Sequence, residues 1–264
     1  MKLLLSLCLL PALLYGQASE ETGLKLTLMS ESLTIVPGEP LTVGLHIQHK
    51  PDFHTYWKNP GIVGIATILE WELPPGFTAS EISWPYPELC DMAGHPCHGY
   101  EREVTLLTTI TPLAQIEASE ITLRAVATWM CCAKTCHPGN KPLQLTLPVS
   151  THKQPHSAAT KLLSKATREI PKPDPNWSMT TLSQKDQSPL KLSFTTTNDD
   201  EPQYFFSSDG QISSDQPQKF ITSKEPKKWT LTIPRSKFAS PSQSPLRGVL
   251  KTKNGLHLLL VASQ

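Results

Sequence analysis

The sequence predicts an all-β fold built from antiparallel sheets packed as sandwiches, and two observations lead to this prediction. Apolar and polar residues alternate along several short runs, which is the period-two pattern of strands with one buried face. Proline-bearing breaks at residues 36–40 and 73–76 separate such runs, and the 264 residues include 25 prolines against 13 glycines. No alternation of strands with helical patterns is visible, so a parallel α/β sheet is not expected.

The first residues have the pattern of a cleaved secretory signal peptide, which we assign to residues 1–18. A positive charge at Lys2 precedes an apolar run over residues 3–14, and small residues follow at Gly16 and Ala18. The apolar run is shorter than the roughly 20 residues that a membrane-spanning helix needs. We therefore expect a soluble, exported mature chain in an oxidising compartment, without Cys8 and with five remaining cysteines.

The mature chain divides into two expected β-domains joined by a linker. Residues 19–150 form the first sandwich, residues 151–176 form a polar linker with a short helix at 158–170, and residues 177–264 form a smaller second domain. The second domain contains no cysteine, so any redox chemistry belongs to the first. Strands are predicted at residues 24–28, 41–47, 104–110, 121–129, 143–147, 190–194, 229–233, 248–252 and 256–261.

The charge balance argues against one class of partner, the nucleic acids. The chain has 24 basic and 23 acidic residues and no basic stripe of the kind that nucleic-acid binders present. The one local basic excess, at residues 224–228, is interpreted as a solvated turn. We expect no nucleic-acid partner and no cofactor.

Half of the cysteines crowd into one short segment, at Cys131, Cys132 and Cys136. In a continuous strand the last two would lie roughly 13 Å apart, beyond the limit of about 7 Å between the Cα atoms of a disulfide. A tight turn over residues 133–135 would bring them opposite one another, within bridging range. We interpret them as a redox-active pair, while a structural disulfide and a metal site stay open as alternatives.

Strand parity separates the neighbouring thiols. Cys131 shares its face with the apolar residues of the preceding strand and is predicted to be buried and inert, whereas Cys132 is predicted to be the more accessible. Lys134 and His137 are the local cations that could lower a thiol pKa.

Cys90 and Cys97 form a second pair, six residues apart, with three interpretations. The first is a structural disulfide that closes the loop. The second is a copper or zinc site in which His95 and His98 join the two thiols, with His54 or His137 as a further ligand. The third is redox exchange with the main cysteine cluster.

His54 and Tyr56 belong to an aromatic run that also includes Phe53 and Trp57. A histidine between aromatic residues is more often packed and hydrogen-bonded than a ligand or a base, so a structural role is expected for His54. The aromatic side chains, Tyr56 among them, are candidates for shielding the cysteine pair from oxidants.

Four motifs follow one another in the first domain: FHTYWKNPG at residues 53–61, WPYP at 84–87, GYE at 99–101, and Trp129 with Cys132, Cys136 and Pro138. In this order they resemble the N-terminal region of the DsbD/ScsB family of periplasmic thiol:disulfide interchange proteins. Residues 203–206 and 245–250 are similar to the second β-domain of the ScsB-like branch. The pair resembles ScsB in its spacing, since DsbD spaces its cysteines more widely, and Cys131 is an addition to the motif.

The resemblance implies immunoglobulin-like sandwiches in the periplasm and a protein-disulfide reductase activity. Cys136 would be the attacking nucleophile and Cys132 the resolving partner. Electrons would come from a membrane-embedded reductase of the DsbD/CcdA type and pass to oxidised periplasmic proteins, thioredoxin-like ones among them. Full-length family members continue into a membrane domain and a thioredoxin-like domain, whereas this chain ends at Gln264, so a separate membrane partner is expected. A copper- or zinc-binding envelope protein and a non-redox interaction module stay open as alternatives.

Overall fold

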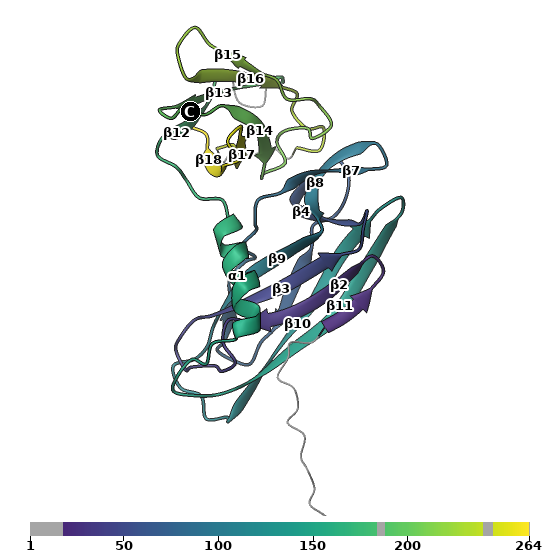
Figure 1. The fold of residues 1–264 in the computed structure, drawn as a ribbon, viewed down its shortest axis with the longest axis vertical. Helices are drawn as coiled ribbons and strands as arrows, with labels where there is room; N and C mark the ends of the chain where they lie inside the picture. The colour runs from purple at the N-terminus through teal and green to yellow at the C-terminus, as the bar shows by residue number, and fades with distance from the viewer. Residues whose placement is uncertain (1–17, 184–187, 240–244, 264) are drawn as a thin grey trace, which may run out of the picture.

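The structure, a computed structural model, describes residues 18–183, 188–239 and 245–263. The predicted signal peptide, apart from its last residue, lies outside the described residues. Figure 1 shows the described chain as two groups of strands, with the one labelled helix beside the sheets of the first group. In these three described ranges no helix is long and apolar enough to cross a membrane.

The first group consists of two antiparallel sheets that enclose a core. One sheet has the strand order β1-β2-β3-β9-β6, and the other has the order β11-β10-β4-β8-β7, with β5 also pairing with β10. The strands of the first sheet are β1 (Ala18–Glu21), β2 (Leu24–Ser30), β3 (Leu41–His49), β6 (Thr78–Ala79) and β9 (Glu103–Thr111). Those of the second are β4 (His54–Gly61), β5 (Ile68–Glu72), β7 (Glu88–Met92), β8 (His95–Glu101), β10 (Glu120–Cys132) and β11 (Cys136–Pro148).

Alternation along the predicted strands decides which face enters this core. In β2 the side chains of Leu24, Leu26 and Leu28 are fully buried, whereas the residues between them are only half-buried. Each fully buried leucine stabilises the fold by roughly 1.5–3 kcal/mol relative to an exposed one. The same alternation runs along β10 from Ile121 to Cys131. All five strands predicted for the first domain are confirmed, within β2, β3, β9, β10 and β11.

The longest hairpin among the described residues carries the cysteine cluster at its end. Strands β10 and β11 are 13 residues each and pair without interruption from Glu120 opposite Pro148 to Cys132 opposite Cys136. Gly139 lies opposite Trp129, and a Cβ atom at Gly139 would come within 2.2 Å of the indole ring. The indole therefore lies directly on the backbone of β11, at a position where only glycine leaves room.

Helix α1 (Ser157–Glu169) packs on the first group, on the side of β3 and β9. Its buried side chains Ala159, Leu163 and Ala166 form a small cluster with Met29 and Leu107. The predicted helix at residues 158–170 is therefore confirmed within one residue. The division of the chain into domains with a linker at residues 151–176 stays a prediction.

The second group consists of two smaller antiparallel sheets around their own core, which includes Phe194, Phe205 and Trp229. The four predicted strands of this region are confirmed as β13, β16, β17 and β18, of which β18 begins one residue later than predicted. Together with the first group they confirm the all-β, sandwich-like fold class. The strands are β12 (Trp177–Thr181), β13 (Leu190–Thr196), β16 (Lys228–Ile233) and β15 (Phe220–Thr222) in one sheet, and β14 (Pro202–Ser207), β17 (Arg247–Thr252) and β18 (His257–Val261) in the other.

The two groups of sheets are in contact through β4 and β8 of the first and β14 of the second. The His98 ring bonds to the Tyr204 hydroxyl through Nε2 at 3.1 Å and contacts the Phe206 ring at 5.0 Å between centroids. Asn59 donates a hydrogen bond to the carbonyl of Ser207. Phe206 also belongs to the core of the first group. Strand β8 is thereby covered by the second group on one face.

Candidate functional site

Cys132 and Cys136 form a disulfide at the end of the β10–β11 hairpin. Their Cα atoms are 4.1 Å apart, because the two residues are direct partners across a three-residue turn. The turn is closed by a hydrogen bond from the Ala133 amide to the Thr135 carbonyl at 3.0 Å. The predicted tight turn and the predicted pairing are therefore both present in the structure.

The two bonded cysteines differ in exposure. Cys136 is exposed at the surface, whereas Cys132 is completely buried. Cys131 is also completely buried, in the first core, and burial raises the pKa of its thiol to about 12. The prediction for Cys131 is thus confirmed in its burial, but the prediction that Cys132 is the more accessible is wrong.

Tertiary packing buries Cys132 although strand parity places it on the outer face of its sheet. It packs in a cluster with Tyr56, Cys90 and Cys97 from the neighbouring strands β4, β7 and β8. Partly buried side chains, Val63, Met92 and Met130, cover this cluster. The outer face is therefore closed by long-range contacts at the point where strand parity predicts an open one.

Cys90 and Cys97 are direct partners on the β7–β8 hairpin. Both are buried, and the structure has them as free thiols. The two residues therefore lie opposite one another on neighbouring strands, but the expected disulfide between them is not formed. We call Cys90 and Cys97 the inner dithiol, and the bond between Cys132 and Cys136 the hairpin disulfide.

His54 lies between the inner dithiol and the hairpin disulfide. It is the direct partner of Cys132 across β4 and β10, and its Nε2 atom is 4.0 Å from Cys97 Sγ. It is buried, and its ring meets the Tyr56 ring edge-on at 5.1 Å. The packed histidine expected from the sequence is thus one that also contacts a thiol.

The surroundings of the inner dithiol make its two thiols unequal. The hydrogen bond from Cys90, with a further contribution from His54, lowers the pKa of the Cys97 thiol, while the same bond and burial raise the pKa of Cys90. Tyr56 is completely buried, and burial raises its pKa above the ordinary value. The Tyr56 hydroxyl has no hydrogen-bond partner among the described residues. The inner dithiol therefore favours a thiolate on Cys97.

The exposed end of the hairpin disulfide has different neighbours. Cys136 Sγ is 3.8 Å from Met92 Sδ on the β7–β8 hairpin. His137 bonds through Nε2 to the hydroxyl of Thr135 at 3.0 Å, so it supports the turn. Lys134 is exposed at the turn. Met92 was not singled out in the sequence, although its place between Cys90 and Cys97 was a usable signal.

The four residues considered as metal ligands do not converge. Cys97 and His98 are consecutive on β8 and point to opposite faces, so His98 bonds to Asn59 and Tyr204 rather than facing the thiols. His95 is exposed at the start of β8. In the part of the chain that the structure describes, no group of three or more His, Cys, Asp or Glu side chains is arranged to hold a metal ion.

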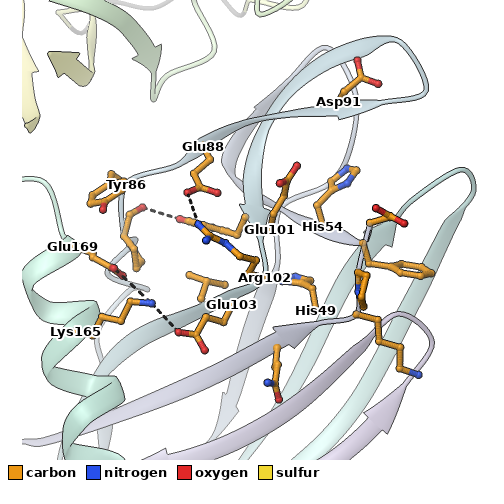
Figure 2. A pocket seen from close by; sticks show the side chains of 18 residues that line it. His49, His54, Tyr86, Glu88, Asp91, Glu101, Arg102, Glu103, Lys165 and Glu169 are labelled. Atoms are coloured by element: carbon orange, nitrogen blue, oxygen red, sulfur yellow. Dashed lines mark hydrogen bonds and ion pairs between the residues drawn. The ribbon is translucent and has the colours of Figure 1, made fainter. Parts of the chain in front are cut away.

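A pocket of about 850 Å³ adjoins the site on the β4–β8 side. Figure 2 shows His54 and Asp91 at one end of it and Lys165 and Glu169 of α1 at the other. Lys165 is held at 2.8 Å from Glu103 and at 3.8 Å from Glu169. The lining has more carboxylates than cations, namely Asp52, Glu88, Asp91, Glu101, Glu103 and Glu169 against Lys50, Arg102 and Lys165.

Comparisons with known proteins match the region that holds this site. The model of the N-terminal family of the thiol:disulfide interchange protein DsbD matches residues 27–148. Among solved structures, the N-terminal periplasmic domain of ScsB from Proteus mirabilis superposes with a TM-score of 0.67 at 17% identity, covering 92% of this chain and 95% of that one. Sporulation control protein Spo0M from Bacillus subtilis matches at 9% identity over 89% and 83% of the two chains, but its TM-score of 0.25 is too low to indicate a shared fold.

Curated proteins gave no match to the sequence. The matched region, residues 27–148, contains the hairpin disulfide, the inner dithiol and His54. The ScsB structure supports the same fold over most of the described chain. Residues 27–148 therefore form a DsbD/ScsB-like N-terminal domain.

Proposed function

We propose that this chain is a periplasmic thiol:disulfide interchange module that passes electrons through the hairpin disulfide. The observation that carries the proposal is the unequal exposure of the two cysteines, with Cys136 at the surface and Cys132 buried. An external thiolate has access to the exposed sulfur, and thiol–disulfide exchange requires direct attack on a disulfide sulfur. A purely structural disulfide has no need of such an accessible end.

The proposed exchange runs through a mixed disulfide on Cys136. A thiolate of the electron donor attacks Cys136 Sγ, and Cys132 leaves as a thiolate that takes up a proton. A second donor thiol then resolves the mixed disulfide and leaves both cysteines reduced. In the reverse direction the Cys136 thiolate attacks an oxidised protein, and Cys132 resolves the bond and releases the reduced product. The chain thereby carries two electrons in each cycle.

The family points to the partners of this exchange. We infer that a membrane-embedded reductase of the DsbD/CcdA type supplies the electrons and that oxidised periplasmic proteins, thioredoxin-like ones among them, receive them. The pocket beside the site, whose lining is rich in carboxylates, favours a partner that presents basic side chains near its reactive cysteine. A purified membrane fraction of the native organism should reduce the hairpin disulfide, and its failure to do so would contradict the inferred donor.

Trapping of the mixed disulfide tests the assignment of Cys136. In the Cys132→Ser variant the resolving thiol is absent, so a covalent adduct with an oxidised thioredoxin-like protein should accumulate on Cys136. The matched Cys136→Ser variant keeps the buried Cys132 and should give no adduct. Peptide mapping by mass spectrometry identifies the bonded residue, and an adduct on Cys132 in the second variant would reverse the assignment.

Equilibration in defined thiol buffers tests whether the disulfide is exchangeable at all. Wild-type protein is incubated at a series of glutathione ratios, quenched with acid and alkylated differentially before mass spectrometry. We expect Cys132 and Cys136 to interconvert between dithiol and disulfide while the fold is retained by circular dichroism. A bond that stays closed in the folded protein under strongly reducing buffers would show a structural disulfide.

A further inference from the structure

The inner dithiol is built so that a small movement would close it into a disulfide. Cys90 and Cys97 are direct partners on antiparallel strands, where opposite Cβ atoms lie about 4.5–5.5 Å apart. A disulfide needs about 3.5–4.5 Å between the same atoms. Cys90 lies on β7, which is an edge strand of its sheet and pairs on one side only, with β8. The inner dithiol can therefore exist in both redox states within one fold.

The inner dithiol is also packed against the buried end of the hairpin disulfide. Cys90, Cys97 and Cys132 belong to one buried cluster with Tyr56. His54 links the two pairs, since it is the strand partner of Cys132 and lies 4.0 Å from Cys97 Sγ. The order across the sheet runs from the exposed Cys136 through Cys132 to the inner dithiol. External reagents reach one end of this series, whereas the other end is enclosed by protein.

The surroundings of Cys97 supply what an attacking thiol needs. The thiolate is the reacting form, and the hydrogen bond from Cys90 together with His54 lowers the pKa of Cys97. The buried Tyr56 hydroxyl has no partner among the described residues and belongs to the same cluster, where it is available as a donor to a thiolate. Cys131 is also a free buried thiol, but it lies in the apolar core of the first group, and burial alone raises its pKa.

We propose that Cys90 and Cys97 form a second redox-active dithiol, which passes its electron pair to the hairpin disulfide inside the folded chain. This inference rests on the proposed function, because the hairpin disulfide is the oxidant. It adds a second, enclosed site that holds two further electrons. The fully reduced chain can then reduce twice as many partner disulfides as the hairpin pair alone.

The exchange balances within the chain in two steps. The Cys97 thiolate attacks Cys132 Sγ, so that the bond between Cys97 and Cys132 forms, the bond to Cys136 breaks, and Cys136 leaves as a thiolate that is protonated by solvent. Cys90 then loses its proton and attacks Cys97 Sγ, and Cys132 leaves as a thiolate that takes a proton. The inner pair ends as a disulfide and the hairpin pair as a dithiol. Two electrons and two protons have moved, and no outside reductant takes part.

A single-turnover experiment on the full chain tests the internal step. Fully reduced protein receives one equivalent of oxidised glutathione, is quenched with acid over a time course and is mapped by differential alkylation and mass spectrometry. We expect the disulfide to appear first at Cys132 and Cys136 and then to distribute over the inner dithiol. In the Cys132→Ser variant the inner dithiol should stay reduced, because its route runs through the Cys132 sulfur.

The Cys90→Ser variant tests the intermediate, since it removes the resolving thiol with little change in shape. A bond between Cys97 and Cys132 should then accumulate. The matched control is Cys131→Ala, which removes a free buried thiol and should leave both pairs exchanging as in the wild type. Circular dichroism verifies that each variant is folded. If a variant does not fold, the time course of the wild-type protein tests the inference by itself.

Two results would overturn the inference, and they differ from failure of the proposed function. Oxidation of the inner dithiol at the wild-type rate in Cys132→Ser would show a direct route from solvent. An inner dithiol that stays reduced while the hairpin pair cycles would show that it takes no part. If the hairpin pair itself does not respond to glutathione, the proposed function fails instead.

Discussion

Replacing Tyr56 with phenylalanine should make the oxidised protein more stable. The Tyr56 side chain is completely buried, and its hydroxyl has no hydrogen-bond partner among the described residues. An unsatisfied buried polar group costs about 1–3 kcal/mol of stability. Phenylalanine keeps the ring, which packs edge-on against His54 and fills the space beside Gly64. The substitution therefore removes the cost and keeps the packing.

The expected gain is about 1–3 kcal/mol in the free energy of unfolding. For a chain of this size, each kcal/mol corresponds to about 2–4 °C in Tm. Denaturant unfolding of the oxidised protein, followed by circular dichroism, measures the change without interference from thiolate chemistry. The slope of the transition should stay the same, because the area exposed on unfolding hardly changes.

Tyr100→Phe is the matched control with the opposite sign. The Tyr100 side chain is also buried, but its hydroxyl donates a hydrogen bond to the carbonyl of Pro85 at 2.7 Å. Removal of the Tyr100 hydroxyl leaves the Pro85 carbonyl without this hydrogen bond and should destabilise the protein by about 1–2 kcal/mol. If Tyr56→Phe destabilises the protein as Tyr100→Phe does, the Tyr56 hydroxyl has a partner in solution and the reasoning is refuted.

Three further predictions concern acid stability, the inner thiol and the hairpin. Burial lowers the pKa of His49 and of His98 to about 4, below the value of about 6.5 in an unfolded chain. As the pH falls, the unfolded chain binds these protons before the folded chain does. The free energy of unfolding should therefore be highest above about pH 6.5 and should decrease as the pH falls toward 4. Urea titrations across this pH range measure the change. Unchanged stability over that range would contradict the neutral buried state. In the reduced protein, His54→Ala should raise the pKa of the Cys97 thiol, which is measured by thiolate absorbance against pH. An unchanged pKa in this variant would show that His54 does not lower the pKa of Cys97. Gly139→Ala places a Cβ atom 2.2 Å from the facing indole and should cost about 1–3 kcal/mol with a change in tryptophan fluorescence, whereas a neutral result would show that the ring can move aside.

The features that could be predicted correctly from the sequence involve residues that lie close together in the chain. Leu24, Leu26 and Leu28 alternate with polar residues, so their strand and its buried face could be predicted. The pairing of Cys132 with Cys136 also followed locally, because three intervening residues leave a tight turn as the way to bring them together. The burial of Cys131 followed from its parity with the apolar face of the same strand.

The strands that build the inner part of the site could not be predicted in this way. In β4 and β8, four consecutive residues are buried, so neither strand shows alternation. Strand β8 is covered on one face by the cysteine cluster and on the other by residues such as Tyr204 and Phe206 of the second group of sheets. Period-two patterns indicate strands with one wet face, and a strand buried on both faces has none.

The amino-acid order alone predicted the sandwich class, the turn that brings Cys132 opposite Cys136, and the burial of Cys131, because each follows from the alternation and spacing of residues that lie close together in the chain. It did not predict that Cys132 is buried, and it did not predict the contact between His54 and Cys97. Those depend on the pairing of β10 with β4 and of β4 with β8, which joins segments far apart in the chain. The local pattern of residues specifies which face of a strand is apolar. Only the packing of strands that are distant in the chain decides which of the two sulfur atoms is accessible to solvent.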